Sequence, residues 1–494
     1  MERDRNHILI VGGGTSGTVL AARLSEDPGL RVTLIEAGPD DDTYGADVLD
    51  PSRAADAWSG EAPIAINEMT TETGVIPMFQ GRLMGGTSAV NGLATLRGLP
   101  SDYDGWAAAG HKGWGWSDVV DTFIAAENDM DFGAAPLHGD KGPLPVRRWR
   151  REELSHAQRA YYDAMVGAGE PSVADINDPS QLPGIGVFPV TIDKAGKRVT
   201  TSLAYLTPEV RARENLAIRT NEQVLRVAVE DGRAQGVVLA GGEHVPADEV
   251  VLAAGAISSP VLLMRSGIGP AAHLAEREVG VHANLPVGMT MSDHLGPGIA
   301  YRHNGPRGGT GGPAQVLFAG ASNGVDVDYH AFPIAPGPSD GDVTEFIMAV
   351  FLMRSSGHGS VRLGNTLDGE PQITAPPLPD DAVHRFRHAF DRLVAWERSD
   401  VVQELGCEPL EAHDLSAPDA VAHALERLTL SYYHMTGTCP MGGVLDSDCR
   451  VHGIEGLRVA DASVMPTIPT GNTYLGCVMI AERIARKMRE HRGK

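Results

Sequence analysis

The sequence predicts a mixed α/β fold in which a parallel sheet flanked by helices is joined to a region of antiparallel strands. Near the N-terminus, a buried-strand run at 7–11 leads through a glycine-rich turn into a helical pattern, and a second buried run follows at 31–36. Strands that alternate with helices in this way form parallel sheets. Within residues 286–430, segments such as 325–332 and 345–353 alternate apolar and polar side chains, which is typical of antiparallel strands.

The composition is that of a globular protein with more than one domain. A chain of 494 residues is too long for one simple core. Apolar residues make up 42% and charged residues 21%, and no apolar stretch is long enough to span a bilayer. The N-terminus runs straight into the apolar strand at 8–11, which leaves no room for the apolar segment of a signal peptide. We therefore expect a cytoplasmic protein without a membrane span.

Charge and cysteine content argue against nucleic-acid and metal binding. The net charge is −23, and no Lys/Arg cluster is dense enough to follow a phosphate backbone. The cysteines form no CxxC pair and have no nearby histidine at zinc spacing. They predict free thiols in a reducing compartment and no metal site. The four positions are Cys407, Cys439, Cys449 and Cys477.

The turn after the first strand has the spacing of a dinucleotide-binding loop. Gly12, Gly14 and Gly17 fit G-x-G-x-x-G between a strand and the start of a helix. Such glycines serve the tight turn, the close approach of a pyrophosphate to the backbone, and the packing of helix on strand. The second strand ends in Glu36, a carboxylate placed to accept hydrogen bonds from an adenosine ribose. This pattern does not distinguish NAD from FAD.

Three further segments bring small residues and backbone amides to one place. Residues 81–92 form a second glycine-rich loop with Asn91 as an amide group, and residues 253–269 follow a buried strand and begin a short helix. Near the C-terminus, a strand ends before Asp461, two prolines prevent regular structure, and a Gly-Asn-Thr step opens a helical run at 474–488. The positive end of that helix suits an anion or an electron-rich ring.

These segments resemble the glucose-methanol-choline (GMC) family of FAD-dependent oxidoreductases. The resemblance spans nearly the whole chain, with the motifs in the family's order. The matching segments are the flavin loop 81–92, the second signature 255–269, the short motifs at 285–288, 293–294 and 359–363, and the closing motifs 434–439, 451–463 and 465–473.

The resemblance implies a Rossmann-like FAD-binding domain and a discontinuous substrate-binding or cap domain built on an antiparallel sheet flanked by helices. The FAD-binding domain is expected at 1–104, 198–285 and 436–494, and the substrate-binding domain at 105–197 and 286–435. The resemblance is weakest in the substrate region.

The family likeness also implies how FAD is held. The pyrophosphate would lie on residues 12–17 with Glu36 at the ribose, Asn91 would approach the isoalloxazine, and the backbone at Val224 would contact the adenine. The full set of residues implied to bind the cofactor is Gly12, Gly14, Thr15, Ser16, Gly17, Glu36, Ala37, Arg82, Gly86, Thr87, Ser88, Asn91, Gly92, Val224, Ala254, Gly255, Asp461, Ala462, Asn472 and Thr473.

Val90 predicts that FAD is bound without a covalent link. It stands where some relatives attach the flavin through a histidine, and a valine side chain has no nucleophile. FAD should therefore be released when the protein is denatured.

The family chemistry is the oxidation of an alcohol, with a hydride passing from carbon to flavin N5 and a proton leaving the hydroxyl group. His434 matches the family's catalytic histidine and is expected to be the base, because an imidazole titrates near neutrality. Asn472 matches the companion position and is expected to hydrogen-bond the substrate oxygen. A primary alcohol would give an aldehyde, and the electrons would pass to oxygen or another acceptor.

Other histidines have weaker claims to a catalytic role. His294 and His452 lie in short motifs of the cofactor-binding region, where histidines more often have a structural role, whereas His358 could line a substrate cavity. The competing interpretation of His434 is that it merely packs between Tyr433 and neighbouring loops.

Two alternatives to alcohol oxidation remain open from the sequence. Hydroxynitrile lyases share this fold and use a histidine as acid or base, and a flavin-binding protein could lack catalysis altogether. Segments 99–106 and 136–145 resemble choline-dehydrogenase-like members of the family. A quaternary ammonium substrate would need aromatic cage residues or a carboxylate beside the ring, which the sequence does not place.

Three further expectations concern local structure outside the motifs described above. Residues 40–79 are expected to be mostly irregular and to cover the cofactor, and the glycine-rich stretch 305–313 is expected to be a surface loop. Ser117 is expected to cap a helix that begins at Asp118.

Overall fold

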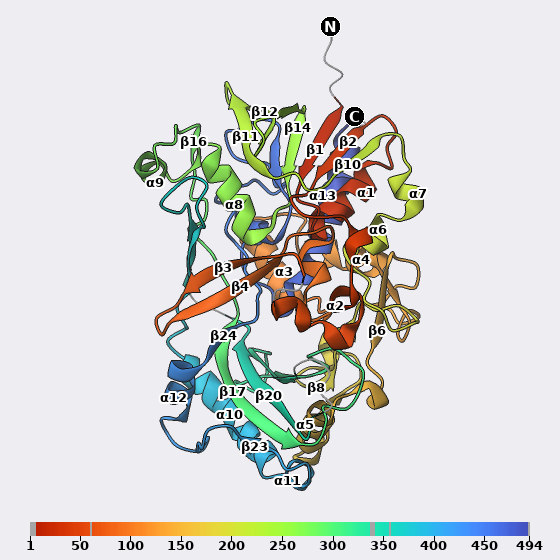
Figure 1. The fold of residues 1–494 in the computed structure, drawn as a ribbon, viewed down its shortest axis with the longest axis vertical. Coiled ribbons are helices and arrows are strands. Elements are labelled where there is room, and N and C mark those ends of the chain that lie inside the picture. Colours follow the sequence, from red (N-terminus) through yellow and green to blue (C-terminus); the bar gives the residue numbers. More distant parts are fainter. Residues whose placement is uncertain (1–5, 60–61, 336–340, 355–356, 493–494) are drawn as a thin grey trace.

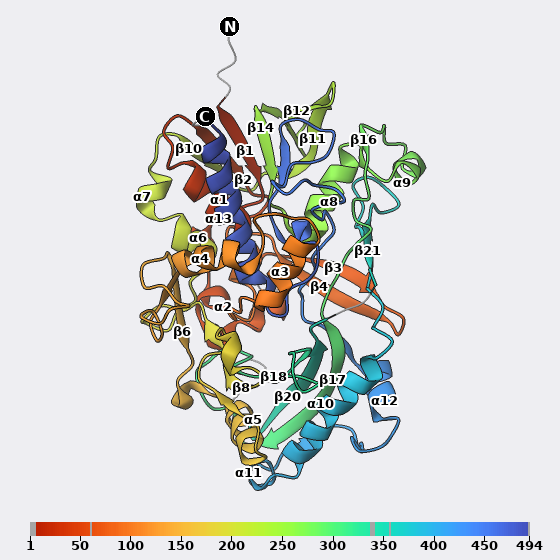
Figure 2. The same cartoon turned by 180° about the vertical axis from the view of Figure 1, so that it is seen from behind.

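The computed structural model describes residues 6–59, 62–335, 341–354 and 357–492. Its elements gather around two sheets, one in the upper half and one in the lower half of Figure 1. Figure 2 shows the same division from behind, with the long C-terminal helix α13 (Thr473–Arg492) running down the upper half.

The upper sheet is parallel and has the strand order β10-β2-β1-β14-β25. Its strands are apolar because helices cover them. Helix α1 (Thr15–Leu24) follows the glycine turn and packs against α13, and α8 (Gly255–Arg265) follows β14. The strand bounds are β1 His7–Val11, β2 Arg31–Ile35, β10 Leu216–Arg219, β14 Glu249–Leu252 and β25 Leu457–Val459.

A small antiparallel sheet beside it contains the predicted hairpin. Strands β11 (Val224–Glu230) and β12 (Arg233–Leu239) are joined through Asp231 and Gly232, whose φ angles are +47° and +74°. Two consecutive positive φ values match the twist of a two-residue hairpin, which confirms the turn predicted from Glu-Asp-Gly-Arg. Strand β13 (His244–Pro246) completes the sheet.

The lower sheet is largely antiparallel and has the order β23-β17-β20-β19-β18-β8-β7, with β24 also paired to β17. Helices α5 (His156–Gly167), α10 (Ala382–Glu397) and α12 (Ala420–Arg427) pack against it. The strand bounds are β7 Ser172–Val173, β8 Gly184–Val187, β17 Leu295–Asn304, β18 Val316–Gly320, β19 Tyr329–Ile334, β20 Val343–Leu352, β23 Glu408–Pro409 and β24 Thr429–Ser431.

The two sheets have separate cores. One cluster of buried side chains surrounds the upper sheet and the other surrounds the lower sheet. Helices α3 (Pro100–Ala108) and α4 (Trp116–Ala126) contribute Trp106 and Phe123 to the upper cluster, whereas α5 contributes Tyr161 to the lower one. The domain boundaries given above remain a prediction.

The remaining elements are short. They are α2 Ala46–Leu49, α6 Thr201–Tyr205, α7 Pro208–Arg211, α9 Ala271–Glu276, α11 Asp400–Glu404, β5 Glu127–Asp129, β6 Leu144–Arg148, β9 Pro189–Val190, β15 Ile268–Gly269 and β16 Ala283–Asn284.

The expectation that residues 40–79 are mostly irregular was wrong. The segment contains β3 (Ile64–Thr70), which forms a hairpin with β4 (Val75–Gly81) and also pairs with β22 (Gln372–Thr374), a partner of β21 (Ser360–Arg362). Buried Ile76 and Met78 alternate with exposed neighbours in β4, which is the period of a strand with one buried face.

The segment 305–313 is a loop as expected, but only part of it lies at the surface: Pro306, Gly309 and Thr310 are exposed, whereas Arg307 and residues 311–313 are buried. The Arg307 side chain is buried, and its Nη2 donates hydrogen bonds to the carbonyls of Gly311 and Gly312 at 2.8 and 2.7 Å. The loop folds inward because the arginine satisfies those carbonyls, and Pro313 lines the central cavity described below.

The cap of α4 differs from the prediction as well. The N-cap residue is Gly115, and the helix begins at Trp116. The Asp118 carboxylate accepts the Gly115 N–H at 3.1 Å, so the acid closes the first turn and Ser117 is not needed as a cap.

Among the described residues, no helix is long and apolar enough to cross a membrane. The four cysteines are free, and Cys439, Cys449 and Cys477 are buried.

Candidate active site

The glycine turn between β1 and α1 is closed by backbone packing on one side and open on the other. A Cβ on Gly17 would lie 1.8 Å from the Gly12 carbonyl oxygen, and a Cβ on Gly12 would lie 2.7 Å from the Ala253 carbonyl oxygen. A Cβ on Gly14 would come no nearer than 3.7 Å to Gly86 Cα. Gly12 and Gly17 therefore allow the turn and the packing of α1, whereas Gly14 leaves room beside the turn for a ligand.

Glu36 is the buried acid at the carboxyl end of β2. Its Oε2 accepts the Gly13 N–H at 2.7 Å, and its Oε1 accepts the Gly38 N–H at 2.9 Å. Burial raises the pKa of this carboxyl group, and the two backbone donors oppose the rise. The carboxylate thus fixes the glycine turn while it lines the cavity beside that turn.

Asp461 connects two elements of the upper half, β25 and α8. Its Oδ2 accepts the Gly255 N–H at 2.9 Å and the Ser259 hydroxyl at 2.6 Å, and its Oδ1 accepts the Ser463 N–H at 2.8 Å. These bonds join the end of β25 to the start of α8, so this acid holds the loops that follow two neighbouring strands.

A cavity of about 650 Å³ runs from the glycine turn to the lower sheet. Every residue of the predicted cofactor set lines it except Gly17, which packs against the backbone, and Ser88. The Ser88 hydroxyl donates to the Gly85 carbonyl at 2.6 Å and accepts the Thr201 N–H at 3.1 Å. Asn91 lines the cavity, but its Oδ1 already accepts from Leu93 N and Arg198 Nη1.

His434 and Asn472 meet on the wall of this cavity. The Asn472 Nδ2 donates to His434 Nε2 at 3.0 Å, and both side chains are buried. His434 follows β24, which lies where the upper and lower halves meet in Figure 1, and Asn472 directly precedes α13. The Asn472 Oδ1 has no hydrogen-bond partner among the described residues.

The surroundings of His434 keep its imidazole neutral. Burial lowers its pKa well below the usual value, and the nearby His294 and His330 lower it further. The Tyr432 ring stacks on the imidazole with centroids 4.1 Å apart and an interplanar angle of 28°. The His434 Nδ1 lies 2.9 Å from the Nδ1 of His294. A neutral imidazole in this position is able to accept a proton.

One carboxylate holds the backbone at both histidines. The Asp293 Oδ1 accepts the His294 N–H at 2.8 Å and the His434 N–H at 2.9 Å, and its Oδ2 accepts the Ser431 hydroxyl at 2.5 Å. Burial raises the pKa of Asp293 to about 6. Its oxygens accept hydrogen bonds from backbone N–H groups and from the Ser431 hydroxyl, and not from either imidazole.

The other two histidines considered from the sequence lie elsewhere. His358 and His452 are both exposed, and neither lines the cavity. Among the described histidines, His294 is the one whose ring nitrogen lies within hydrogen-bond distance of the His434 ring.

Sequence reasoning predicted strands at 325–332 and 345–353 with one face towards a cavity, but it did not identify the apolar side chains that line this cavity together with His434. Phe332 and Ile334 on β19 and Ile347 and Phe351 on β20 line the cavity together with Phe188. Their spacing of two or four along each strand follows the strand period, but the pairing of β19 with β20 is what brings the two sets together.

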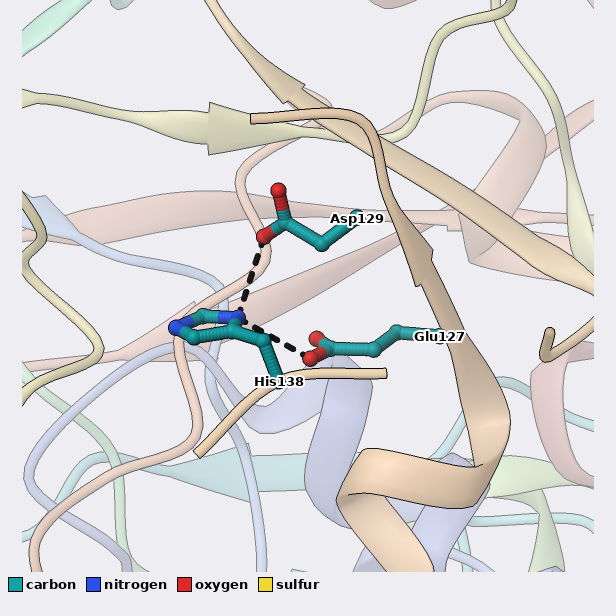
Figure 3. Close-up of side chains that lie close together, drawn as sticks. All are labelled: Glu127, Asp129 and His138. Atoms are coloured by element: carbon teal, nitrogen blue, oxygen red, sulfur yellow. Dashed lines mark ion pairs between the residues drawn. The ribbon is translucent and has the colours of Figure 1, made fainter. Parts of the chain in front are cut away.

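A second buried histidine centre lies away from the cavity. The His138 Nδ1 is 3.0 Å from Glu127 Oε1 and 3.1 Å from Asp129 Oδ2, a spacing that could hold a metal ion (Figure 3). Arg97 already binds Glu127 at 2.5 Å, and Arg148 forms an ion pair with Asp129. The carboxylates are therefore balanced by side chains of the protein itself.

The chain is similar in sequence to proteins named as an oxidase and a dehydrogenase. A 5-(hydroxymethyl)furfural oxidase of Methylovorus sp. (strain MP688) is 35% identical, with 97% of each chain covered. An oxygen-dependent choline dehydrogenase of Burkholderia pseudomallei (strain 1710b) is 32% identical over 98% of this chain and 94% of its own.

Comparison with solved structures gives the same kind of relative. The pyridoxine 4-oxidase from Mesorbium loti superposes with a TM-score of 0.89 at 31% identity, covering 98% of this chain and 99% of its own. The family model described as GMC oxidoreductase matches residues 6–296 with its N-terminal part and 355–481 with its C-terminal part. The Rossmann-like sheet, the glycine turn and the cavity are thus those of a known enzyme fold, and the chain belongs to the GMC oxidoreductase family, whose members are FAD-dependent oxidoreductases acting on alcohol-type substrates.

Proposed function

We propose that this enzyme oxidises a primary alcohol to the aldehyde, with His434 Nε2 taking the hydroxyl proton and Asn472 holding the alcohol oxygen. The observation that carries the proposal is the 3.0 Å approach of the Asn472 amide to His434 Nε2 on the wall of the cavity. Since these two atoms are so close, one alcohol oxygen is able to contact both.

The chemistry of the two side chains fits this task. His434 is neutral because of burial, so its Nε2 is able to accept the proton, and a well-placed base of this kind contributes about 10²- to 10⁴-fold to the rate. The Asn472 amide is held at the start of a helix, where backbone dipoles favour negative charge. FAD, when bound, supplies the hydride acceptor.

The cavity residues suit FAD without a covalent link. The space beside Gly14, the Glu36 carboxylate and the start of α8 at Gly255 lie in a row along the carboxyl edge of the parallel sheet, where this fold binds dinucleotides. Val90 is buried, and its side chain offers no nucleophile to the flavin. Acid precipitation followed by spectroscopy of the supernatant tests this point, because a covalently held flavin would stay in the pellet.

A matched pair of glycine variants tests the cofactor position. Gly14→Ala places its Cβ in the ligand space without meeting protein atoms closer than 3.7 Å, so the protein should fold and lose FAD affinity. Gly17→Ala places its Cβ 1.8 Å from a carbonyl oxygen, so the fold itself should suffer. Full flavin content in Gly14→Ala would contradict the proposed pyrophosphate position.

The substrate we propose is an uncharged alcohol with a flat, aromatic body. Phe188, Phe332, Phe351 and Tyr432 line the substrate side of the cavity and offer aromatic surface. Among the described residues, the acidic side chains in the lining are Glu36, Glu222 and Asp461, which all follow strands of the upper sheet. A cationic alcohol would therefore find no carboxylate on the substrate side.

Anaerobic reduction of the flavin is the decisive test. Benzylic and furfuryl alcohols should bleach the oxidised flavin faster than choline, and the aldehyde should appear in equal amount. Admission of air would then show whether oxygen or another acceptor takes the electrons. Bleaching by no alcohol, or release of aldehyde and cyanide from a cyanohydrin without bleaching, would overturn the proposal and favour a lyase.

We also propose a cytoplasmic location. Its support is the presence of four free cysteines, three of them buried, which suits a reducing compartment. Fractionation of the source cells with an antibody against the protein tests it, and recovery in an oxidising compartment would contradict it.

A further inference from the structure

We propose that His294 is a positioning residue that holds His434 in the tautomer with a proton on Nδ1 and a free lone pair on Nε2. This inference rests on the proposed role of His434 as the base. It assigns a task to a histidine that is buried beside the site but does not line the cavity.

The contact between the two histidines requires a single shared proton. Their Nδ1 atoms lie 2.9 Å apart, and the rings are nearly perpendicular, with an interplanar angle of 84°. Burial lowers the pKa of His294 to about 3 and that of His434 well below its usual value, so both rings are neutral. A neutral imidazole carries one N–H, so one ring donates from Nδ1 and the other accepts at Nδ1.

The surroundings select which ring donates. The amide nitrogen of Asn472 faces His434 Nε2 at 3.0 Å, and an N–H donor requires a lone pair on the nitrogen it faces. The Nε2 of His294 has no hydrogen-bond partner among the described residues, so a proton there meets no competing acceptor contact. His294 then carries its proton on Nε2, and its Nδ1 lone pair accepts the N–H of His434.

The opposite arrangement leaves the base unusable. If His294 donated from Nδ1, then His434 would carry its proton on Nε2, where the alcohol proton has to be received. Two N–H groups, from His434 and from Asn472, would also face each other at 3.0 Å. His294 thus acts as the fixed acceptor in the same way that a carboxylate orients the base of a catalytic triad, although it carries no charge.

The backbone holds the two rings in register. Asp293 Oδ1 accepts the N–H groups of both histidines, and Ser292 and Thr436 exchange two backbone hydrogen bonds of 3.0 Å. The segments that carry the two histidines therefore form one unit, so the distance between their Nδ1 atoms does not depend on a flexible loop. When His434 takes the alcohol proton on Nε2, its Nδ1–H continues to donate to His294.

The test uses His294→Leu and His294→Asn in the FAD-loaded enzyme. Leucine removes the acceptor, whereas the asparagine carbonyl offers an oxygen near the position of Nδ1. We expect the rate constant of anaerobic flavin reduction to fall about 10²-fold in His294→Leu and less than about 10-fold in His294→Asn, with little change in KM. His303→Asn is the matched control, because His303 on β17 is equally buried, does not line the cavity and is not among the groups that lower the pKa of His434.

A second measurement reads the tautomer without turnover. In the ¹⁵N-histidine NMR spectrum, the His434 signals, assigned by their loss in His434→Asn, should show a protonated Nδ1 and a bare Nε2 in the wild-type enzyme. In His294→Leu the protonated nitrogen should change or become a mixture. A protonated Nε2 in the wild type, or a His294→Leu enzyme with unchanged reduction rate and tautomer, would overturn the inference. If no alcohol reduces the wild-type flavin, the proposed function fails, while the tautomer measurement still decides the contact between the histidines.

Discussion

The protein contains two buried histidine centres with opposite protonation. His434 packs with His294 and His330, and burial together with these neighbours holds its pKa well below the usual value. Burial alone would also lower the pKa of His138, but hydrogen bonds with Asp129, Asp175 and Glu127 outweigh it and raise the pKa to about 10. At neutral pH the first centre is uncharged and the second is an imidazolium.

The comparison shows that partners, and not burial, decide the charge of an enclosed histidine. Around His138, three carboxylates meet two guanidinium groups, from Arg97 and Arg148, so the network is neutral when the imidazole is protonated. Around His434, the oxygens of the nearby Asp293 carboxylate accept hydrogen bonds from backbone N–H groups and from the Ser431 hydroxyl. The arrangement around His434 leaves a neutral base, and the arrangement around His138 gives a fixed cation.

The charged centre also supports the active-site loop. Arg97 lies six residues beyond Asn91, and its backbone N–H donates to Asn177 Oδ1 at 3.1 Å, while Asn177 Nδ2 donates to the Thr95 carbonyl at 2.9 Å. His138 and Arg148 both bind Asp175, two residues before Asn177. We infer that the ion network fixes the chain that leaves the flavin loop.

The largest expected effect comes from removing the neutral base. His434→Asn should lower the rate constant of anaerobic flavin reduction by about 10²- to 10⁴-fold, because an asparagine amide cannot take the alcohol proton that His434 Nε2 accepts. Stopped-flow absorbance at the flavin band measures it. His358→Asn, at an exposed position outside the cavity, should leave the rate unchanged. A fall of less than about 5-fold in His434→Asn would exclude the base assignment.

Removing the cation from the charged centre should mainly lower stability. His138→Gln leaves an excess buried carboxylate, for which we expect a loss of about 3–5 kcal/mol in the free energy of unfolding. Adding Asp175→Asn restores the charge balance, so the double variant should lose less than the sum of the single losses. Urea unfolding followed by circular dichroism measures both, and strict additivity would refute the balance argument.

The two centres should respond to pH in opposite directions. His294, His330 and His434 are neutral when folded and protonate near pH 6.5 when unfolded, so stability should fall as the pH drops below about 6.5. His330→Asn should reduce that acid slope by about 1.4 kcal/mol per pH unit. The contribution of His138, whose folded pKa is raised, should be lost as the pH rises towards about 10. The free energy of unfolding, measured across pH 5–10, tests both the acid and the alkaline loss of stability. Equal dependence of stability on pH in the wild type and in His330→Asn would contradict the neutral state of His330.

The smallest effect should follow from Asp293→Asn. The remaining amide oxygen is able to accept the backbone N–H groups, so we expect a loss of about 1 kcal/mol in stability and a rate change of a few fold. A rate loss as large as that of His434→Asn would mean that the carboxylate charge, and not its hydrogen bonds, serves catalysis.

Local sequence patterns were sufficient to predict those features that depend on a few adjacent residues. The strand-turn-helix with Gly12, Gly14 and Gly17 and the hairpin at Asp231 were predicted correctly, because each depends on a few adjacent residues. The hairpin at 64–81 was missed, since β3 is stabilised by its pairing with β22, about 300 residues later in the chain. The inward fold of 305–313 was missed because it depends on where the Arg307 side chain finds its acceptors.

The sequence by itself determined the family, the α/β class and the candidacy of His434 and Asn472, because those rest on residue types at fixed spacing. The tertiary structure decided that these two side chains lie 3.0 Å apart, that His294 is in contact with the base, and that His138 is charged while His434 is neutral. The reason is physical. The pKa of a histidine and the position of its proton depend on partners that folding brings from distant parts of the chain, and spacing along the sequence carries no information about them.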